Sequence, residues 1–217
     1  MEFLQNNVFW LVILAVAAIG GIAYYLSWLR RKKLGELASS MGLLFSEEGP
    51  DQAFLEGTGL EIFCSGHSRK ASNMIQVSSP AGELRFFDYR YSTGHGKHRH
   101  THHFTLALVK CAIQVPDFEL KPETLMYKLG EAIGFKDIDL PAFPVFSDKY
   151  RLTGADETAV HMFFTPERAA WFERNPGLRL QGGRNSIVFF KRDGNLPADA
   201  WQGFMEEVKA FAAEVLK

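Results

Sequence analysis

The sequence has almost no net charge and too few cysteines for a disulfide-stabilised fold, and each absence excludes a class of protein. It has 24 Lys and Arg against 25 Asp and Glu, so its formal net charge is −1. Because nucleic acid binds domains with a clear positive field, we expect no nucleic-acid partner. The two cysteines are Cys64 and Cys111. In a reducing compartment we expect both to be small buried hydrophobic residues rather than a disulfide.

Charge is also absent from residues 8–29, and this is the most informative feature of the chain. A helix rises about 1.5 Å per residue, so this run is long enough to cross a hydrocarbon core of roughly 30 Å. Aromatic side chains, which prefer membrane interfaces, lie near both of its ends: Phe9, Trp10, Tyr24, Tyr25 and Trp28. The sequence therefore predicts an N-terminal transmembrane anchor over residues 1–29.

Two alternatives to an anchor are a cleaved signal peptide and a buried core helix. A signal peptide has a positive start, a shorter apolar core and small residues at its cleavage site. Residues 1–7 contain no Lys or Arg, and Ser27-Trp28-Leu29 makes a poor cleavage site. An unbroken apolar run followed directly by four cations is not typical of a core helix. The anchor is the interpretation we adopt.

The four cations that follow the anchor predict its orientation. They are Arg30, Arg31, Lys32 and Lys33. Loops rich in Lys and Arg stay in the cytoplasm, so the N-terminus is expected outside and residues 30–217 in the cytoplasm. The same cations are candidate contacts for anionic lipid headgroups, at about 1 kcal/mol each, although fixing the topology is a sufficient role. Membrane lipid is thus an expected partner.

Short apolar runs broken by Gly, Pro and Ser predict an α+β fold, an antiparallel sheet with flanking helices. The membrane helix is expected to continue over residues 30–41 and to stop at Gly42. A long β-hairpin is expected around Gly94 and Gly96, with Pro116 ending its second strand. The strands expected in this part are 60–63, 74–77, 83–91 and 101–115.

The remainder of the chain is expected to mix strands with helices. Helices are predicted at 122–134 and 165–175, strands at 146–153 and 159–164, and a second hairpin over 178–191. The amphipathic pattern of residues 197–216 predicts a last helix that buries Trp201, Phe204 and Phe211.

The chain also fits two similar α+β halves, 30–116 and 117–217. The motif Leu37-x-x-x-Met41-Gly42 in the first is matched by Leu129-x-x-x-Ile133-Gly134 in the second.

Five of the seven histidines fall between residues 95 and 103. On a strand, His98, His100 and His102 share one face but lie about 7 Å apart, which is too far for all three to bind one ion. A closed zinc site usually takes closer ligands from two separate loops. We therefore expect an exposed polar hairpin with no bound metal and no cofactor. A pH-sensitive surface is the alternative, because imidazoles titrate near pH 6.5.

Two pairs of residues suggest catalysis, and neither has a third group at convincing spacing. Cys64 and His67 would point to opposite faces of a strand unless the chain turns between them. Asp88 and Arg90 share a strand face among aromatic residues. There Asp88 is either a perturbed catalytic acid or, more commonly, a polar group paired with a neighbouring Arg or Lys. We do not expect an enzyme.

Several short motifs, in order, resemble an uncharacterised family of small bacterial proteins. They are residues 66–73 (GHSRKASN), 87–97 (FDYRYSTGHGK), 118–123 (FELKPE) and 146–150 (FSDKY), behind one N-terminal anchor. Members carry one transmembrane helix and a cytoplasmic α+β domain. The resemblance implies a bacterial inner-membrane location and no particular activity.

Three functions are compatible with these patterns. The first is a non-enzymatic, membrane-anchored interaction or scaffold module that binds a protein partner or lipid headgroups at the cytoplasmic face. The second is a metal- or pH-responsive sensor that uses the histidine hairpin. The third is a membrane-surface enzyme that uses Asp88 and His67. We favour the first because no catalytic constellation has convincing spacing.

Overall fold

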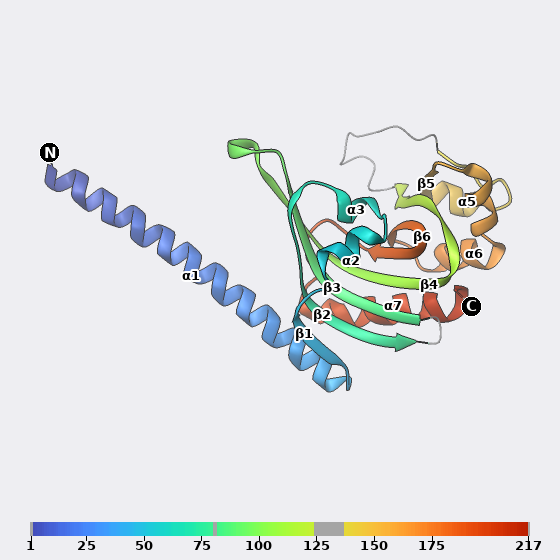
Figure 1. Ribbon diagram of the computed structural model, residues 1–217, viewed down its shortest axis with the longest axis horizontal. Coiled ribbons are helices and arrows are strands. Elements are labelled where there is room, and N and C mark those ends of the chain that lie inside the picture. The colour runs from blue at the N-terminus through green and yellow to red at the C-terminus, as the bar shows by residue number, and fades with distance from the viewer. Residues whose placement is uncertain (1, 80–81, 124–136, 217) are drawn as a thin grey trace.

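Helix α1 (Glu2–Ser40) runs from the N-terminus into a domain built around one antiparallel sheet (Figure 1). This is seen in a computed structural model that describes residues 2–79, 82–123 and 137–216. Among those residues, α1 is the helix long and apolar enough to cross a membrane. None of its most apolar window is buried, so this segment is not a core helix of the domain.

The C-terminal end of α1 belongs to the domain. Leu34 and Ala38 are fully buried in its core. Gly42 ends the helix with φ of +67°, and the Leu43 N–H donates to the Ala38 carbonyl at 2.9 Å. The left-handed turn at Gly42 brings the Leu43 N–H to one of the terminal carbonyls of the helix.

In the described part of the chain, six strands form the sheet, in the order β1-β2-β3-β4-β5, with β6 also paired to β4. All named strand pairs are antiparallel. The strands are β1 (Leu44–Glu48), β2 (His67–Ser79), β3 (Gly82–Thr93), β4 (His100–Pro122), β5 (Tyr150–Gly154) and β6 (Arg179–Phe190). The predicted hairpin is confirmed as β3 and β4, joined through the short turn η1 (Gly96–His98).

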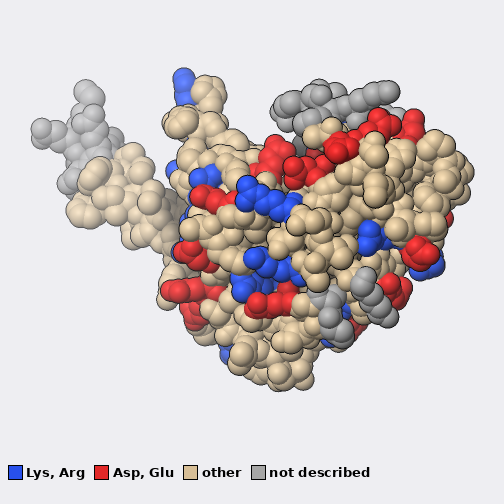
Figure 2. All heavy atoms as spheres, turned by 45° about the vertical axis from the view of Figure 1, so that its right-hand side comes forward, with Lys and Arg blue, Asp and Glu red and all other residues tan. Residues whose placement is uncertain are grey.

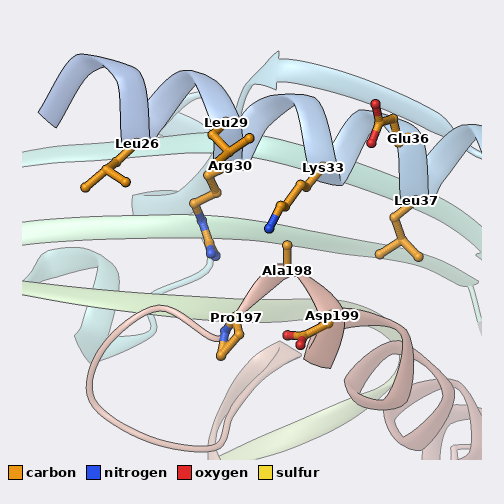
Figure 3. A pocket seen from close by; sticks show the side chains of 9 residues that line it. All are labelled: Leu26, Leu29, Arg30, Lys33, Glu36, Leu37, Pro197, Ala198 and Asp199. Atoms are coloured by element: carbon orange, nitrogen blue, oxygen red, sulfur yellow. The ribbon is translucent and has the colours of Figure 1, made fainter. Parts of the chain in front are cut away.

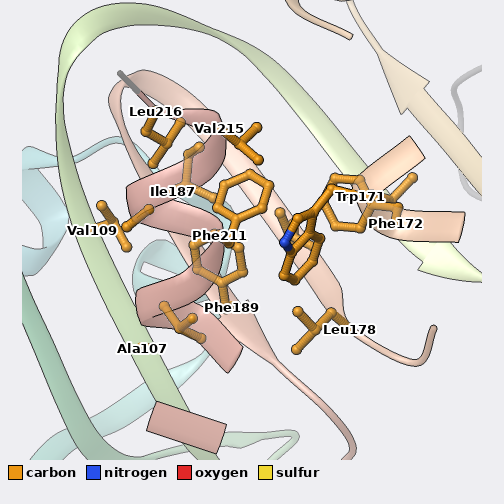
Figure 4. Close-up of a cluster of buried hydrophobic side chains, with 14 of the residues drawn as sticks. Ala107, Val109, Trp171, Phe172, Leu178, Ile187, Phe189, Phe211, Val215 and Leu216 are labelled. Atoms are coloured by element: carbon orange, nitrogen blue, oxygen red, sulfur yellow. The ribbon is translucent and has the colours of Figure 1, made fainter. Parts of the chain in front are cut away.

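Both faces of the sheet are covered, because successive side chains of a strand point to opposite faces. Phe86 and Phe189 belong to the core under α7 (Trp201–Val215), α6 (Pro166–Arg174) and the end of α1. Phe87 and Phe190 belong to a second core under α2 (Gln52–Gly57) and α3 (Glu61–Cys64). Figure 4 shows part of the first core, where Phe211 lies among Trp171, Phe172 and Phe189.

The predicted last helix is confirmed as α7, preceded by the turn η3 (Ala198–Ala200). Trp201, Phe204 and Phe211 are buried, as expected. The helix predicted after Thr165 is confirmed as α6. The helix predicted over 122–134, including the second copy of the repeated motif, falls mainly on residues 124–136, outside the described residues.

Several short predicted strands are wrong. The apolar run 60–63 lies largely in α3, and 159–163 lies in α5 (Glu157–Phe163). Of the strand predicted over 146–153, residues 146–149 lie in α4 (Pro144–Lys149), whereas 150–153 are confirmed as part of β5. Short apolar runs do not distinguish a buried helix from a strand. In α5, the side chain of Asp156 accepts from the Ala159 N–H at 3.0 Å and caps the first turn.

The second predicted hairpin is also wrong, because β6 is one continuous strand. Gly182 and Gly183 lie in the middle of it rather than in a turn. A Cβ on Gly182 would overlap the ring of Phe118 on β4, so the glycine permits close packing. Pro116 likewise does not end β4, which continues to Pro122; it lies where the β4–β6 register shifts between Val115 and Phe118. The boundary expected between residues 116 and 117 therefore falls inside β4.

Candidate functional site

The side chain of Arg30 leaves α1 just after the charge-free segment and enters the domain. Its Nε donates to Asp88 Oδ2 at 2.7 Å, and one terminal nitrogen donates to Asp88 Oδ1 at 2.8 Å. The other terminal nitrogen donates to the Leu196 carbonyl at 2.7 Å. A guanidinium bound in this bidentate way to a carboxylate is a strong and directional contact.

Asp88 lies on β3 and is 4 % exposed. Besides Arg30, it accepts from Thr105 Oγ1 at 2.9 Å and from the Asn73 side-chain amide at 2.8 Å. Thr105 is its direct cross-strand neighbour on β4. Asn73 sits at a register irregularity of β2 with φ of +55°, a backbone state that Asn tolerates better than most residues.

The loop before α7 closes this network. The Leu196 N–H donates to Thr105 Oγ1 at 2.9 Å, while the Leu196 carbonyl accepts from Arg30. The Arg30 guanidinium carbon also lies 6.0 Å from the centre of the Trp201 ring. One side chain thus joins the membrane helix to β3, β4 and the start of α7, and the anchor is fixed to the domain.

The other three cations of the expected headgroup cluster have different surroundings. Arg31 donates to Glu47 of β1 at 2.7 Å, and both side chains are partly in solvent. Lys32 lies 3.9 Å from Glu36 and over the Trp28 ring. Lys33 is exposed. Arg30 and Arg31 are thus held by carboxylates of the domain, whereas Lys32 and Lys33 are exposed; lipid binding by these four residues stays a prediction.

A groove of about 600 Å³, here called the anchor groove, lies between α1 and the turn before α7. Figure 3 shows Leu26, Arg30, Lys33 and Leu37 directed from α1 toward Pro197, Ala198 and Asp199. Its lining combines leucines with charges of both signs. Because Leu26 and Leu29 come from the charge-free segment, the groove begins at the end of that segment.

The histidines do not form the single row expected on a strand. His98 belongs to the turn η1, whereas His100 and His102 lie on β4 with ring centres 4.6 Å apart. His102 stacks on Tyr91 at 4.8 Å, and its Nε2 is 2.9 Å from Thr93 Oγ1. Burial, together with the nearby His100, lowers the pKa of His102 from its usual value.

That these histidines hold no metal ion stays a prediction. Within residues 2–79, 82–123 and 137–216, no group of three His, Cys, Asp or Glu side chains is placed to hold a metal ion. His67 and His95, from separate strand ends, stack at 4.9 Å, and two imidazoles alone do not close a tetrahedral site.

The side chains considered for catalysis, and the second cysteine, are placed in the fold as follows. Cys64 is an exposed thiol at the end of α3, so the expectation that it is buried is wrong. His67 instead approaches Ser68 at 3.1 Å and the Gly94 carbonyl at 2.9 Å. Cys111 is buried as expected, and burial raises the pKa of its thiol to about 12. The Asp88 carboxylate accepts its hydrogen bonds from Arg30, Asn73 and Thr105, so it acts as a structural counterion.

Sequence reasoning missed that Arg30 is the partner of Asp88. It expected a neighbouring cation such as Arg90, two residues away on the same strand face. One signal in the sequence could have indicated a buried charge pair: Asp88 is the charged residue in a strand segment of aromatic residues, Phe86 to Tyr89, and all four are buried. A buried carboxylate requires a cation. The pattern does not say which cation supplies the charge.

The chain was compared with protein families, curated proteins and solved structures. No protein-family model matches the chain, and no curated protein matches it. The fold is similar to that of a mycobacterial transport factor. The crystal structure of the mycobacterial trehalose monomycolate transport factor A, TtfA, aligns with a TM-score of 0.57, over 87 % of this chain and 96 % of that chain. The two sequences are 11 % identical, so the likeness shows a shared fold.

Proposed function

We propose that this chain is a membrane-anchored interaction module whose domain holds a protein partner at the cytoplasmic face of the membrane. The observation that carries the proposal is the bidentate contact between Arg30 and Asp88. It fixes the domain on the end of the anchor, so any surface beside Arg30 stays at the membrane. A flexibly tethered enzyme would have no need of such a contact.

The anchor groove is the surface we propose for that partner, and the occupant we propose is a membrane-spanning helix of the partner. Leu26, Lys33 and Leu37 lie on one face of α1, spaced by seven and four residues. The same face continues into the charge-free segment through Ile22 and Ile19, which are exposed in this chain. A helix packed along that face in the lipid would therefore run directly into the groove.

The fold likeness supports a more specific form of the proposal. TtfA is named as a transport factor, and we propose that the partner here is also a membrane protein concerned with transport. A non-enzymatic role is consistent with the surroundings of Asp88 and His67, whose polar atoms are occupied by contacts within the domain.

Photo-crosslinking in native membranes tests the proposal. A photoreactive amino acid at Lys33 or Ala198 is expected to join the chain to a discrete membrane protein. At Met162, which is 77 % exposed and lies on α5 away from the anchor, it is expected to give none. Asp88→Asn is expected to weaken the groove crosslink while the chain stays in the membrane. Equal crosslinking at Met162, or none in the groove, would refute the proposal.

A further inference from the structure

A second cleft, here called the basic cleft, opens beside Arg30 between α1 and the sheet. Its volume is about 870 Å³. It is lined from α1 by Leu26, Ser27, Arg30 and Arg31, and from β2, β3 and β4 by residues that include Lys70, Arg90 and His103. The anchor groove shares Leu26 and Arg30 with it but lies toward α7.

Three basic side chains form a row across the floor of this cleft. Lys70 on β2 is directly opposite Arg90 on β3, and Arg90 is directly opposite His103 on β4. Arg90 is two residues beyond Asp88, so the row lies on the same sheet face as the Arg30 contact. Directly opposed side chains have Cβ atoms about 5 Å apart, and like charges in that position destabilise a sheet.

The nearby acidic groups do not neutralise this row. Asp88 is bound by Arg30, and Glu47 is bound by Arg31. Lys70 and Arg90 are exposed, and neither side chain has an ion pair with a residue in the described part of the chain. Glu48 also lines the cleft, which leaves two permanent cations facing one carboxylate.

The cleft also lies at the membrane end of the domain. Leu26 and Ser27, which form one of its walls, belong to the charge-free segment of α1. Beyond the basic row, the β3–β4 hairpin projects from the same side of the domain as α1 (Figure 1). Its tip carries Lys97 and Arg99 and has no acidic residue, and Figure 2 shows blue without red at the tip.

We infer that the basic cleft binds the phosphate-bearing headgroup of an anionic lipid of the membrane that α1 spans. Arg90 is suited to contact two phosphate oxygens through its planar guanidinium, and Lys70 supplies a second point charge. The lipid chains would lie along the Leu26 side of α1. The bound anion would relieve the repulsion within the basic row. The inference rests on the proposed function only in that α1 is taken to span the membrane.

Lipid titration of the purified full-length chain tests this inference. The chain, in neutral detergent, is titrated with phosphatidylglycerol or phosphatidylcholine, and bound lipid is followed by native mass spectrometry. We expect preferential binding of phosphatidylglycerol. Lys70→Gln with Arg90→Gln is expected to weaken it roughly 30-fold, the effect of two cations near a membrane surface. The matched control, Arg174→Gln with Lys209→Gln, removes the same charge far from α1 and is expected to leave binding unchanged.

Each other outcome overturns the inference. Equal binding of both lipids would show that no anion site exists, and equal loss in the control variant would show a general charge effect. Displacement of phosphatidylglycerol by millimolar inorganic phosphate would assign the cleft to a soluble anion.

Thermal unfolding of the same samples provides a second measurement. Phosphatidylglycerol is expected to raise the melting temperature of the natural chain more than that of the Lys70→Gln, Arg90→Gln variant. Equal shifts would overturn the inference. Because no protein partner is present in these samples, failure of the crosslinking experiment leaves this result unaffected.

Discussion

Arg30, the first cation after the membrane segment, donates two hydrogen bonds to Asp88, which lies 58 positions further along the chain. The Arg30 side chain keeps 20 % of its surface exposed and the Asp88 side chain 6 %. A residue type that usually marks the cytoplasmic end of a membrane helix is therefore also part of the domain. The contact adds to the burial of Leu34 and Ala38 in holding the end of α1 against the domain.

Breaking the contact from one side is expected to destabilise the chain strongly. Asp88→Asn keeps the shape of the side chain but leaves Arg30 without a counterion, at a cost of about 3 kcal/mol, the lower end for a buried pair because Arg30 is partly exposed. Denaturant unfolding of the full-length chain in detergent measures the loss. Glu47→Gln removes the partner of Arg31 at the surface and is the control, with an expected cost under about 1 kcal/mol.

Replacing both partners is expected to cost less than replacing one. In Arg30→Met with Asp88→Leu, no buried charge is left alone, and apolar replacements of buried pairs are often tolerated. The double-mutant cycle then gives a coupling energy between the two sites. Additive single and double losses would show that Arg30 and Asp88 do not stabilise each other.

The orientation of the anchor is open to direct measurement. A C-terminal reporter is expected to be active only in the cytoplasm, and the chain is expected to stay in the membrane after carbonate washing. Neutralising Arg30, Arg31, Lys32 and Lys33 together is expected to weaken or invert the topology. Lys32→Gln with Lys33→Gln isolates the topological effect, because it leaves the Asp88 contact intact. A periplasmic reporter, or a mature protein that starts near Leu29, would contradict the assignment.

Truncating the centre of α7 is expected to destabilise the first core. Phe204 is buried, and its ring meets Phe86 edge to face at 6.0 Å. Phe204→Ala is expected to cost about 3–5 kcal/mol, the usual range for a core Phe. Gln202→Ala, on the exposed side of the same helix, is expected to change stability by less than about 0.5 kcal/mol. Similar losses for the two variants in chemical denaturation would mean that α7 does not pack as described.

The two thiols are expected to differ sharply in reactivity. Cys64 is exposed, whereas Cys111 is buried and has a pKa raised to about 12. Since the thiolate is the reacting species, a thiol reagent at pH 8 is expected to modify Cys64 quickly and Cys111 only after unfolding. Cys64→Ser should therefore remove the fast phase. A fast phase that persists in this variant would show that Cys111 is accessible.

Stability is expected to fall on acidification because of His102. Its pKa is lowered in the folded state, so below about pH 6.5, the ordinary value, the unfolded chain binds more protons than the folded one. The contribution of neutral His102 is therefore fully present above that pH and is lost as the pH falls toward the lowered value. His102→Phe preserves stacking on Tyr91 and is expected to flatten the melting temperature between pH 7.5 and 5. His98→Phe, at the exposed tip, is the control, and an equal effect there would contradict the assignment to His102.

Sequence patterns predicted the elements with a long and regular period. The apolar stripe of α7 has seven buried positions at helical spacing, and the β3–β4 hairpin combines strand-like runs with Gly94 and Gly96 at φ of +68° and +57°. Shorter elements were misassigned. Residues 60–63 and 159–164 are apolar without a distinguishing period, and their packing against the sheet rather than their own preference determines that they are mostly helical.

The candidate site was harder to predict from the sequence than the fold was. Asp88 was expected to pair with a cation, and it does, but the cation comes from the membrane helix. Lys70, Arg90 and His103 lie far apart in sequence and become neighbours only through strand register. Register depends on how strands pair and on the turns that join them, so it cannot be read from one strand alone.

The sequence by itself determined the charge-free apolar segment, the end of α1 at Gly42 and the apolar face of α7, because each follows from interactions within one stretch of chain. The tertiary structure alone decided that Arg30 binds Asp88, that Gly182 lies in a strand rather than a turn, and that basic residues form a row beside the anchor. The physical reason is that the local sequence allows a charge more than one counterion, a glycine either a turn or a strand, and a strand more than one neighbour. The choice among them is made by burial, which only the assembled sheet and helices create.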